Sequence, residues 1–381
     1  MKIVCGLIIT LTLLSCGGRS AHLQEGGDSI PFKYATLPSI VKYDGYTVVT
    51  LANPWKEGKA LHTYVLVPSN APLPVHLPKG TVIRTPLKRA VVFTTVHCAL
   101  LMELGCRDKI AGVADLKYIK IPWIQRQAAK GRIADCGDGM NPMIEKIIDL
   151  RPDAILLSPF ENSGGYGKLE EIDIPLVECA EYMEVSPLAR AEWMRFYGLL
   201  FGCQKKADKL FEKVDKNYCD LQQKAQEAGE GCSVLIDKQV GSVWYVPGGQ
   251  STIGQMVKDA SGRYPWADDD HSGSLSMPFE RVLEEAFDME VWMFRYDSDK
   301  PMTFDDLLAE KEGYKEFRAF ETREVYGCNV RTSLFYEESP FHPDRLLSDF
   351  IQILHPDIKG LPPLHYYKKL PHHYFFHLSS F

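Results

Sequence analysis

The chain has 381 residues, 45% of them hydrophobic, which is typical of a globular protein with two α/β domains rather than of a disordered one. Its formal net charge of −7 at pH 7, without a basic cluster, gives no electrostatic reason to expect nucleic acid as a partner. No Gly-x-Ser-x-Gly, His-Glu-x-x-His or Walker sequence is present. We therefore expect neither catalytic residues nor a cofactor.

The first residues carry an export signal. Met1 and Lys2 precede a short apolar run over 3–14, which ends at Ser15 and Cys16. The run is too short to span a bilayer comfortably. It resembles the bacterial lipoprotein signal, which is cut before a cysteine that is then lipidated. We expect a signal peptide over 1–15, lipidation of Cys16, a tether over 16–38, and a location on the periplasmic side of the cell envelope. An ordinary signal peptide is the alternative and would also export the chain.

Residues 39–203 are predicted to form a first lobe. Two strands at 46–51 and 62–67, separated by a turn-rich loop, predict a hairpin laid on this lobe, although the role of residues 40–84 stays open. From residue 89 the pattern alternates: a strand at 90–94, a helix at 98–104 and a strand at 110–113 form a βαβ unit, which favours a parallel sheet. Further elements are expected at 133–138, 142–150, 154–157 and 175–178.

A long amphipathic helix is predicted over 204–228. Its apolar residues follow the i, i+3, i+4, i+7 rule and the intervening residues are largely charged. At 1.5 Å per residue it is about 37 Å long, enough to join two domains. A surface helix of one domain is the alternative. A second β/α series begins at 233–237 and predicts a second lobe over 229–381.

One segment occurs on both sides of this helix. Asn141 to Asp153 leads into the apolar run 154–157, and Met277 to Asp288 leads into 291–294. Aligning Glu145 with Glu280 matches several following residues in kind. In each copy a helix begins near a proline, carries a glutamate in its first turn and is followed by a buried strand. The duplication predicts two lobes with matching corners; a chance match of generic helix-strand units is the alternative.

The cysteines and histidines do not indicate a metal site. Beyond Cys5 and Cys16 eight cysteines remain, none in a Cys-x-x-Cys spacing, and their pairing cannot be derived from the sequence. No His/Cys cluster has the spacing of zinc ligands. The histidines near the C-terminus, at 372, 373 and 377, are interpreted as part of a terminal tail.

Over about residues 88–370 the chain resembles the class III substrate-binding proteins of ABC importers, which capture ferric siderophores, cobalamin and heme. The resemblance is carried by VVFTT at 91–95, LLMELG at 100–105, IAGV at 110–113, GDGMNP at 137–142 with Glu145 and RPD at 151–153, the long helix, and VWYVPGG at 243–249. WADDD at 266–270, SGSL at 272–275, DRLL at 344–347 and ILHP at 353–356 resemble a Bacteroidetes-type branch of this family. The implied fold is α/β, with two Rossmann-like lobes joined by a single long backbone helix and a ligand cleft between them.

The resemblance implies a role for the repeated glutamates. In this family a glutamate on top of each lobe meets arginines of the membrane permease, and Glu145 and Glu280 match those positions. Acidic residues in the first turn of a helix stay ionised and available to a basic partner. The alternative is that both are only favourable helix-start charges. The implied partners are the permease and ATPase of an importer, with the chain acting as a monomer.

The ligand is expected where loops follow the carboxyl ends of the strands. Those loops are rich in aromatic residues, which can stack on a macrocycle or a catecholate ring. The candidate ligand-binding residues are Thr95, His97, Tyr118, Trp123, Phe160, Tyr166, Trp244, Tyr245, Arg263 and Trp266. For each aromatic residue a place in the core is the alternative, and the cleft is favoured for Trp244 and Trp266. Arg263 would pair with an anionic ferric complex.

The expected function is capture of an iron complex, a ferric siderophore, and its delivery to the importer. Cobalamin (or another corrinoid) and heme are alternatives for the same fold, with His97 as a candidate iron ligand or, alternatively, a hydrogen-bonding residue at a helix start. A carrier of free Zn²⁺ or Mn²⁺ would need donors from both lobes, for which His97, Glu161, Asp268 to Asp270 and His271 are available. An exported enzyme is the remaining alternative.

Overall fold

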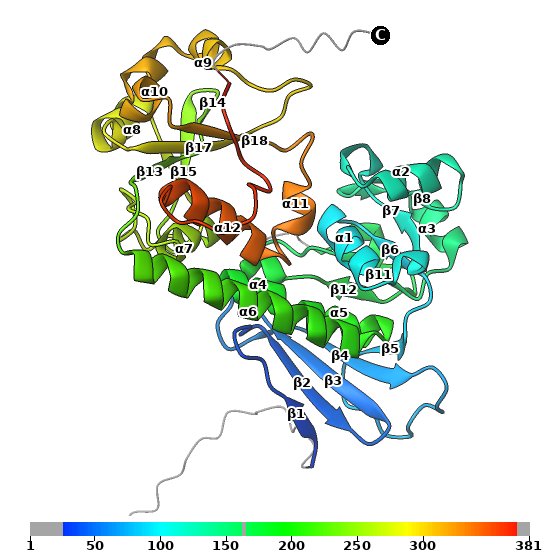
Figure 1. The fold of residues 1–381 in the computed structure, drawn as a ribbon. Helices are drawn as coiled ribbons and strands as arrows, with labels where there is room; N and C mark the ends of the chain where they lie inside the picture. The colour runs from blue at the N-terminus through cyan, green and yellow to red at the C-terminus, as the bar shows by residue number, and fades with distance from the viewer. Residues whose placement is uncertain (1–25, 162–164, 372–381) are drawn as a thin grey trace, which may run out of the picture.

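The computed structural model describes residues 26–161 and 165–371, and two α/β lobes stand on one long helix in it (Figure 1). The first lobe has a parallel sheet of order β12-β11-β6-β7-β8. Its strands are β6 (Ala90–Val92), β7 (Ile110–Val113), β8 (Ala134–Asp135), β11 (Ala154–Leu157) and β12 (Leu176–Glu178). Its helices are α1 (Thr95–Glu103), α2 (Pro122–Ala129), α3 (Ile144–Leu150), α4 (Pro187–Glu192) and α5 (Met194–Phe201), with 3₁₀ turns η1 (Arg107–Lys109), η2 (Leu116–Tyr118), η3 (Gly167–Glu170) and η4 (Glu181–Met183).

The second lobe has a sheet of order β13-β17-β18-β19, parallel except for β19. Its strands are β13 (Val234–Ile236), β17 (Val291–Tyr296), β18 (Val325–Asn329) and β19 (Lys368–Lys369), beside an antiparallel sheet of β14 (Gln239–Val240), β15 (Val243–Pro247) and β16 (Ser274–Met277). Its helices are α7 (Thr252–Asp259), α8 (Phe279–Ala286), α9 (Phe304–Glu310), α10 (Arg318–Glu321), α11 (Phe335–Glu338) and α12 (Pro343–Leu354), with the turn η5 (Glu312–Glu316).

A single long helix, α6 (Gln204–Ala228), joins the two lobes. It packs against α5 of the first lobe and α12 of the second, and it runs beneath both in Figure 1. The buried residues follow the helical period and form one stripe: Ala207, Phe211, Val214, Tyr218 and Ala225. The Tyr218 hydroxyl donates to the Asp259 carboxylate of α7 at 2.6 Å, which ties the helix to the second lobe. The predicted fold class is confirmed.

The duplicated segment has the same structure in both lobes. β10 (Asn141–Pro142), paired with β9 (Gly137–Asp138), leads into α3 and then β11, as β16, paired with β15, leads into α8 and then β17. Glu145 is the second residue of α3, and Glu280 is the second residue of α8. Both side chains are exposed. The predicted matching corners are therefore present in the fold.

The N-terminal hairpin prediction was too small. Residues 28–85 form a five-stranded sheet of order β1 (Asp28–Ile30), β2 (Pro38–Tyr43), β3 (Tyr46–Ala52), β4 (Ala60–Pro68) and β5 (Thr81–Thr85). β3 and β4 are the predicted pair. One face carries Val49 and Tyr64 into the main hydrophobic core, where Tyr64 stacks on Phe196 of α5. Alternate residues of a strand face opposite sides, so a second small cluster with Val48 and Val65 covers the outer face.

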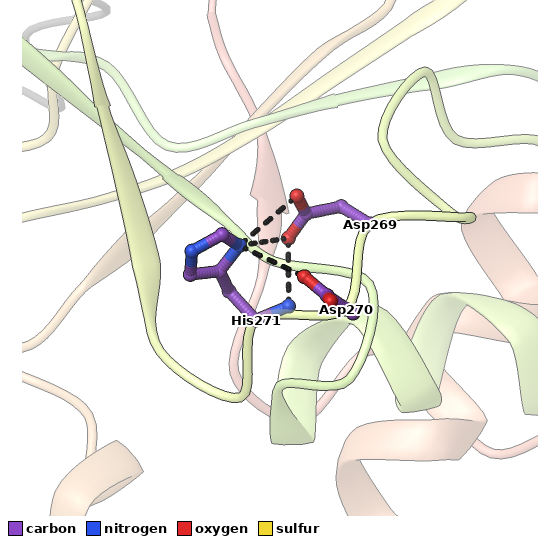
Figure 2. Close-up of side chains that lie close together, drawn as sticks. All are labelled: Asp269, Asp270 and His271. Atoms are coloured by element: carbon purple, nitrogen blue, oxygen red, sulfur yellow. Dashed lines mark hydrogen bonds and ion pairs between the residues drawn. The ribbon is translucent and has the colours of Figure 1, made fainter.

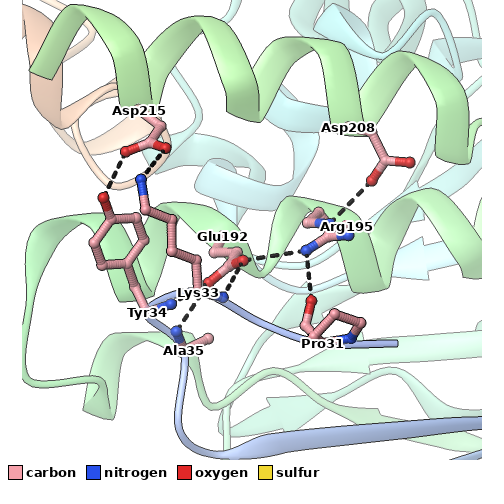
Figure 3. A network of polar contacts seen from close by, with 8 residues as sticks. All are labelled: Pro31, Lys33, Tyr34, Ala35, Glu192, Arg195, Asp208 and Asp215. Carbon is pink, nitrogen blue, oxygen red and sulfur yellow. Dashed lines mark hydrogen bonds and ion pairs between the residues drawn. The ribbon is translucent and has the colours of Figure 1, made fainter. Parts of the chain in front are cut away.

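The predicted tether over 16–38 is also corrected, because its described part is fastened to the body (Figure 3). Glu192 of α4 is fully buried and accepts backbone N–H groups of Lys33, Tyr34 and Ala35 at 2.8, 2.7 and 2.9 Å. The Lys33 ammonium and the Tyr34 hydroxyl both donate to Asp215 of α6, each at 2.7 Å. A buried carboxylate that receives three amides is well compensated for lost hydration. Cys16 and the signal peptide lie outside the described residues.

Two thiols of the first lobe lie close enough to pair. The Sγ atoms of Cys106, after α1, and Cys203, before α6, are 3.4 Å apart. The hydrogen bond with Cys203, helped by Lys109 and Lys206, lowers the pKa of Cys106 to about 7. A lower pKa gives more thiolate, the form that attacks a disulfide.

We expect glutathione disulfide to oxidise Cys106 and Cys203 by thiol–disulfide exchange, two thiols giving one protein disulfide and two reduced glutathiones. The bond would close a loop across 97 positions and stabilise the fold by about 2–4 kcal/mol. Non-reducing peptide mapping checks this, with the buried Cys98→Ser variant as a control that should still form the bridge. Recovery of both thiols unmodified at equilibrium would contradict the prediction.

Candidate functional site

A pocket of about 330 Å³ lies between the lobes. The first lobe contributes the turn from β6 into α1, with Thr94, Thr95 and Val96. The second lobe contributes α7, the end of β17, α11 and the start of α12. Both β6 and β17 are parallel strands, and ligands of such sheets bind beyond the carboxyl ends of the strands. The short helix α4, which lies beside α6 between the lobes, completes the wall (Figure 1).

The lining of this interlobe pocket is positively charged and hydroxylated. Arg190 of α4 and Arg295 of β17 line it, and none of its described lining residues is Asp or Glu. Three threonines, one serine and two aromatic residues also line it, and of the aromatic residues Tyr336 is 49% exposed. An apolar wall with a few polar groups is typical of small-molecule sites.

The two pocket arginines differ in their partners. Arg295 donates to both carboxylate oxygens of Asp237, at 3.1 and 2.6 Å, and its guanidinium lies over the Phe335 ring at 5.7 Å. The guanidinium of Arg190 makes no hydrogen bond or ion pair with any described residue, and its Nε is shielded from solvent. Burial lowers the pKa of Arg190, although Glu181 and Tyr197 oppose the effect. One positive charge of the pocket is therefore neutralised within the protein and the other is not.

A second hollow, of about 630 Å³, opens in the first lobe and shares Thr94 with the interlobe pocket. It is lined by residues that follow β6, β7 and β11, among them Phe93, Asp115 and Phe160. Tyr166 also lines it, and its hydroxyl donates to Glu178 at 2.6 Å. Glu178 in turn pairs with His62 of β4 at 3.0 Å, so the N-terminal sheet helps to hold Tyr166 in place.

The lobes also touch directly beside the pocket, through α1 and α11. The Thr95 hydroxyl donates to Glu337 at 3.2 Å, and His342 lies 2.6 Å from Glu103 across the same boundary. His342 is buried, and although burial lowers its pKa, Asp344 and Glu103 raise it overall. These contacts hold the two walls of the pocket at a defined spacing.

Three predicted ligand-binding residues line one of these two hollows: Thr95 the interlobe pocket, and Phe160 and Tyr166 the first-lobe hollow. The other predicted residues line neither of the two. Tyr118 is 62% exposed beside Lys117, Trp123 packs on the core beneath Arg107, and Tyr245 points outward from β15. Arg263 lies near the C-terminal end of α6, where it pairs with Glu290 at 2.5 Å.

His97 is an interior residue rather than a ligand for heme iron. Only 1% of its surface is exposed. Its Nε2 atom lies 3.1 Å from the Glu181 carboxylate and 3.0 Å from the Tyr197 hydroxyl. Its Nδ1 atom contacts the Thr94 hydroxyl. Burial opposes the imidazolium, but facing Cys179 and Glu181 raises the pKa of His97 to about 10. Its contribution to the site is to fix Thr94, which lines both hollows.

Trp244 and Trp266 belong to the core, so the prediction that they face the cleft was wrong. Trp244 is fully buried among Phe279, Trp292 and Tyr314, and its indole N–H donates to the Ile236 carbonyl at 3.1 Å. Trp266 is 7% exposed and its indole N–H donates to Glu285 at 2.5 Å. A large ring whose one polar atom finds a partner is well accommodated in a core.

The side chains of Glu145 and Glu280 have no hydrogen-bonding or ion-pair partner among the described residues. Both lie in the first turn of a helix, where the backbone N–H groups favour negative charge. Glu145 also borders the first-lobe hollow, whereas Glu280 borders neither hollow. Their role in docking stays a prediction.

The metal donors considered from the sequence do not converge from both lobes. Asp269, Asp270 and His271 are the one group of three within the described residues whose ligand atoms approach one another, and they follow each other on a surface loop of the second lobe (Figure 2). The His271 ring is already hydrogen-bonded to Asp269 at 3.1 Å. His97 is buried in the first lobe, as described above.

Sequence reasoning missed the residues that dominate the interlobe pocket, namely Arg190, Thr252, Arg295, Phe335 and Tyr336. Arg295 had a signal, because it directly follows the apolar run 291–294 of a strand and so lies near its carboxyl end. Arg190 had none, since a single arginine in a short helix is common on surfaces.

A family model described as "Periplasmic binding protein" matches residues 91–332, more than half of the chain. An uncharacterized lipoprotein of Methanocaldococcus jannaschii is 26% identical over 76% of this chain and 70% of its own. An uncharacterized ABC transporter substrate-binding lipoprotein of Bacillus subtilis, YvrC, is 23% identical over 64% of this chain and 73% of its own.

Solved structures with the same fold include an Fe³⁺-hydroxamate transport protein of Saccharomonospora viridis (18% identity, TM-score 0.54, 71% of this chain and 94% of that one). A periplasmic heme binding protein of Pseudomonas aeruginosa has 16% identity and a TM-score of 0.56 over 72% of this chain and 95% of its own. The vitamin B12 binding protein of Vibrio cholerae has 15% identity and a TM-score of 0.52, over 72% of this chain and 99% of its own.

In residues 26–161 and 165–371, none of the helices has the length and apolar character needed to cross a membrane.

Proposed function

The chain belongs to the periplasmic binding protein family, and on that premise we propose that it captures a ferric siderophore between its lobes and delivers it to the permease and ATPase of an ABC importer. The observation that carries the proposal is the interlobe pocket, with its unpaired arginine, hydroxyls and exposed tyrosine. Its volume of about 330 Å³ lies within the typical range of small-molecule sites, ~300–1,000 Å³, and the 630 Å³ hollow adjoins it at Thr94.

Export and anchoring belong to the same proposal. The apolar run before Cys16 supports a lipid anchor, and relatives named as lipoproteins support it further. The protein then acts as a monomer at the periplasmic side of the cell envelope, within reach of the permease. Binding is non-covalent, so no catalytic group is required.

Heme and corrinoids are the competing ligands, because solved proteins with this fold are named for each of them. The two propionates of heme could pair with an arginine. His97, however, is buried in the interior and cannot reach the iron of a heme bound in the pocket. A free Zn²⁺ or Mn²⁺ ion is disfavoured by the positive lining of the pocket.

Isothermal titration calorimetry of the purified protein against a panel of ferric siderophores, heme, cobalamin, Zn²⁺ and Mn²⁺ tests the proposal. We expect one class of ferric siderophore to bind with a Kd below about 1 µM and the free ions to give no heat. Calorimetry is preferable to tryptophan fluorescence, because Trp193, Trp244 and Trp292 are fully buried. Tight binding of a free ion without any chelate would contradict the proposal.

A further inference from the structure

Arg190 is an uncompensated cation at the boundary between the lobes. α4 begins at Pro187, capped by the Ser186 hydroxyl, which accepts the Ala189 N–H at 3.1 Å, and the helix directs Arg190 to the pocket. No described carboxylate or carbonyl accepts a hydrogen bond from its guanidinium. A charged group withdrawn from water without a partner is costly, and such groups are normally paired.

The surrounding charges make the missing partner specific. Glu181, which acts on Arg190 electrostatically, is already paired with His97 at 3.1 Å and accepts the Tyr197 hydroxyl at 2.7 Å. Asp237 of the second lobe is paired with the other pocket arginine, Arg295, at 2.6 Å. These two carboxylates are thus paired with other groups, and the Arg190 side chain lines the pocket without a partner among the described residues.

We propose that Arg190 binds a negatively charged oxygen of the ligand, so that the pocket selects anionic chelates over uncharged or cationic ones. The inference rests on the proposed function and narrows it to a class of ligand. A guanidinium forms two parallel hydrogen bonds with a carboxylate or with the adjacent oxygens of a catecholate. Thr94, Thr95 and Thr252 offer hydroxyls for the remaining oxygens, and the Tyr336 ring offers a face for stacking. Ferric tris-catecholates and carboxylate-bearing chelates fit this description, whereas cobalamin and ferric trihydroxamates carry no comparable negative charge.

The test compares wild type with Arg190→Gln and Arg190→Lys, by calorimetry with a ferric tris-catecholate and a ferric trihydroxamate. We expect Arg190→Gln to weaken binding of the anionic chelate roughly 10- to 100-fold, the range for a lost hydrogen bond to a charged group, and to leave the uncharged chelate unchanged. Arg190→Lys should lose less, since it keeps the charge but not the fork. Arg126→Gln, on the exposed face of α2, removes the same charge away from both hollows and should change neither affinity.

A second arm separates this inference from the proposed function. Thermal unfolding of wild type in millimolar benzoate or inorganic phosphate should shift upward, and Arg190→Gln should abolish the shift. If the small anions stabilise wild type but not Arg190→Gln, while no iron chelate binds, the anion site is supported and the siderophore function is contradicted. If the tris-catecholate binds Arg190→Gln as tightly as wild type, the inference about Arg190 is overturned and the siderophore function stands.

Discussion

Replacing Glu181 with Gln is expected to lower the free energy of unfolding by about 3–5 kcal/mol, the range for breaking one partner of a buried ion pair. Glu181 and His97 are each 1% exposed, so water cannot replace the lost charge. The amide keeps the shape of the side chain but cannot balance the imidazolium, and His97 must then become neutral or remain an unpaired buried cation. Urea unfolding followed by circular dichroism measures the loss.

The pH dependence of that loss distinguishes an ion pair from simple packing. Burial opposes ionisation of Glu181, yet facing His97 lowers its pKa to about 2, so its contribution is complete above its ordinary pKa of 4.5 and disappears as the pH falls towards 2. The pKa of His97 is raised from 6.5 to about 10, so its contribution is complete below pH 6.5 and disappears as the pH rises through 10. The difference between wild type and Glu181→Gln should therefore be largest between about pH 4.5 and 6.5.

A matched control is Glu171→Gln, an exposed carboxylate of the same lobe, which should change stability by less than about 0.5 kcal/mol. A stability difference for Glu181→Gln that stays constant from pH 3 to pH 10 would show that the charge of the pair is irrelevant. Since His97 also contacts Thr94, the variant should weaken chelate binding as well.

The double variant Glu145→Ala/Glu280→Ala is expected to slow transport roughly tenfold or more while leaving ligand affinity unchanged. Both carboxylates are exposed at equivalent positions of the two lobes and lack partners within the described residues, so they are free to meet a basic surface. Charges at the rim of an interface act mainly on the association rate, so the defect should grow at low concentration of the binding protein. Uptake of radioactive iron chelate into proteoliposomes that contain the importer measures it.

The chain provides its own control for this experiment. Asp149 and Glu284 lie four residues further on in α3 and α8 and are equally exposed, so Asp149→Ala/Glu284→Ala removes the same charge from the same helices. That variant should transport normally. If Glu145→Ala/Glu280→Ala transports at the native rate, the docking role is contradicted and both glutamates are only favourable charges at helix starts. A fall in chelate affinity would instead assign Glu145 to the hollow that it borders.

The two-lobed fold was predictable because its main signals are local. The stripe of α6 repeats with helical period and no Gly or Pro interrupts it, so the predicted span 204–228 agrees with the helix observed. The duplicated corners were recognisable because proline, glutamate and a buried strand follow in fixed order. The family match confirms the resemblance seen in the sequence, and its assignment to a Bacteroidetes-type branch remains a prediction.

The N-terminal sheet was underestimated most clearly at its first strand, which is short and polar. β1 has three residues, and the segment before β2 is fixed by Glu192 and Asp215, which lie more than 150 positions away. Contacts between residues so far apart in the chain leave no pattern in the local sequence. The segment before β2 was therefore predicted to be a tether.

The site was harder to predict, since a strand shows which residues share a face but not which face is buried. On β15, Trp244 points into the core and Tyr245 points out, and only the packing of α8 and η5 decides this. Arg190 could be recognised as unpaired only after Glu181 and Asp237 had been assigned to His97 and Arg295. Unpaired charge is a property of the folded arrangement and has no counterpart in the order of residues.

An anionic iron chelate in the interlobe pocket should be detectable by native mass spectrometry of the protein purified from its own iron-limited cells. We expect an iron-containing adduct on wild type that is largely lost from Arg190→Gln and retained by Arg126→Gln. A retained ligand without iron, or an iron adduct that Arg190→Gln holds as fully as wild type, would contradict it.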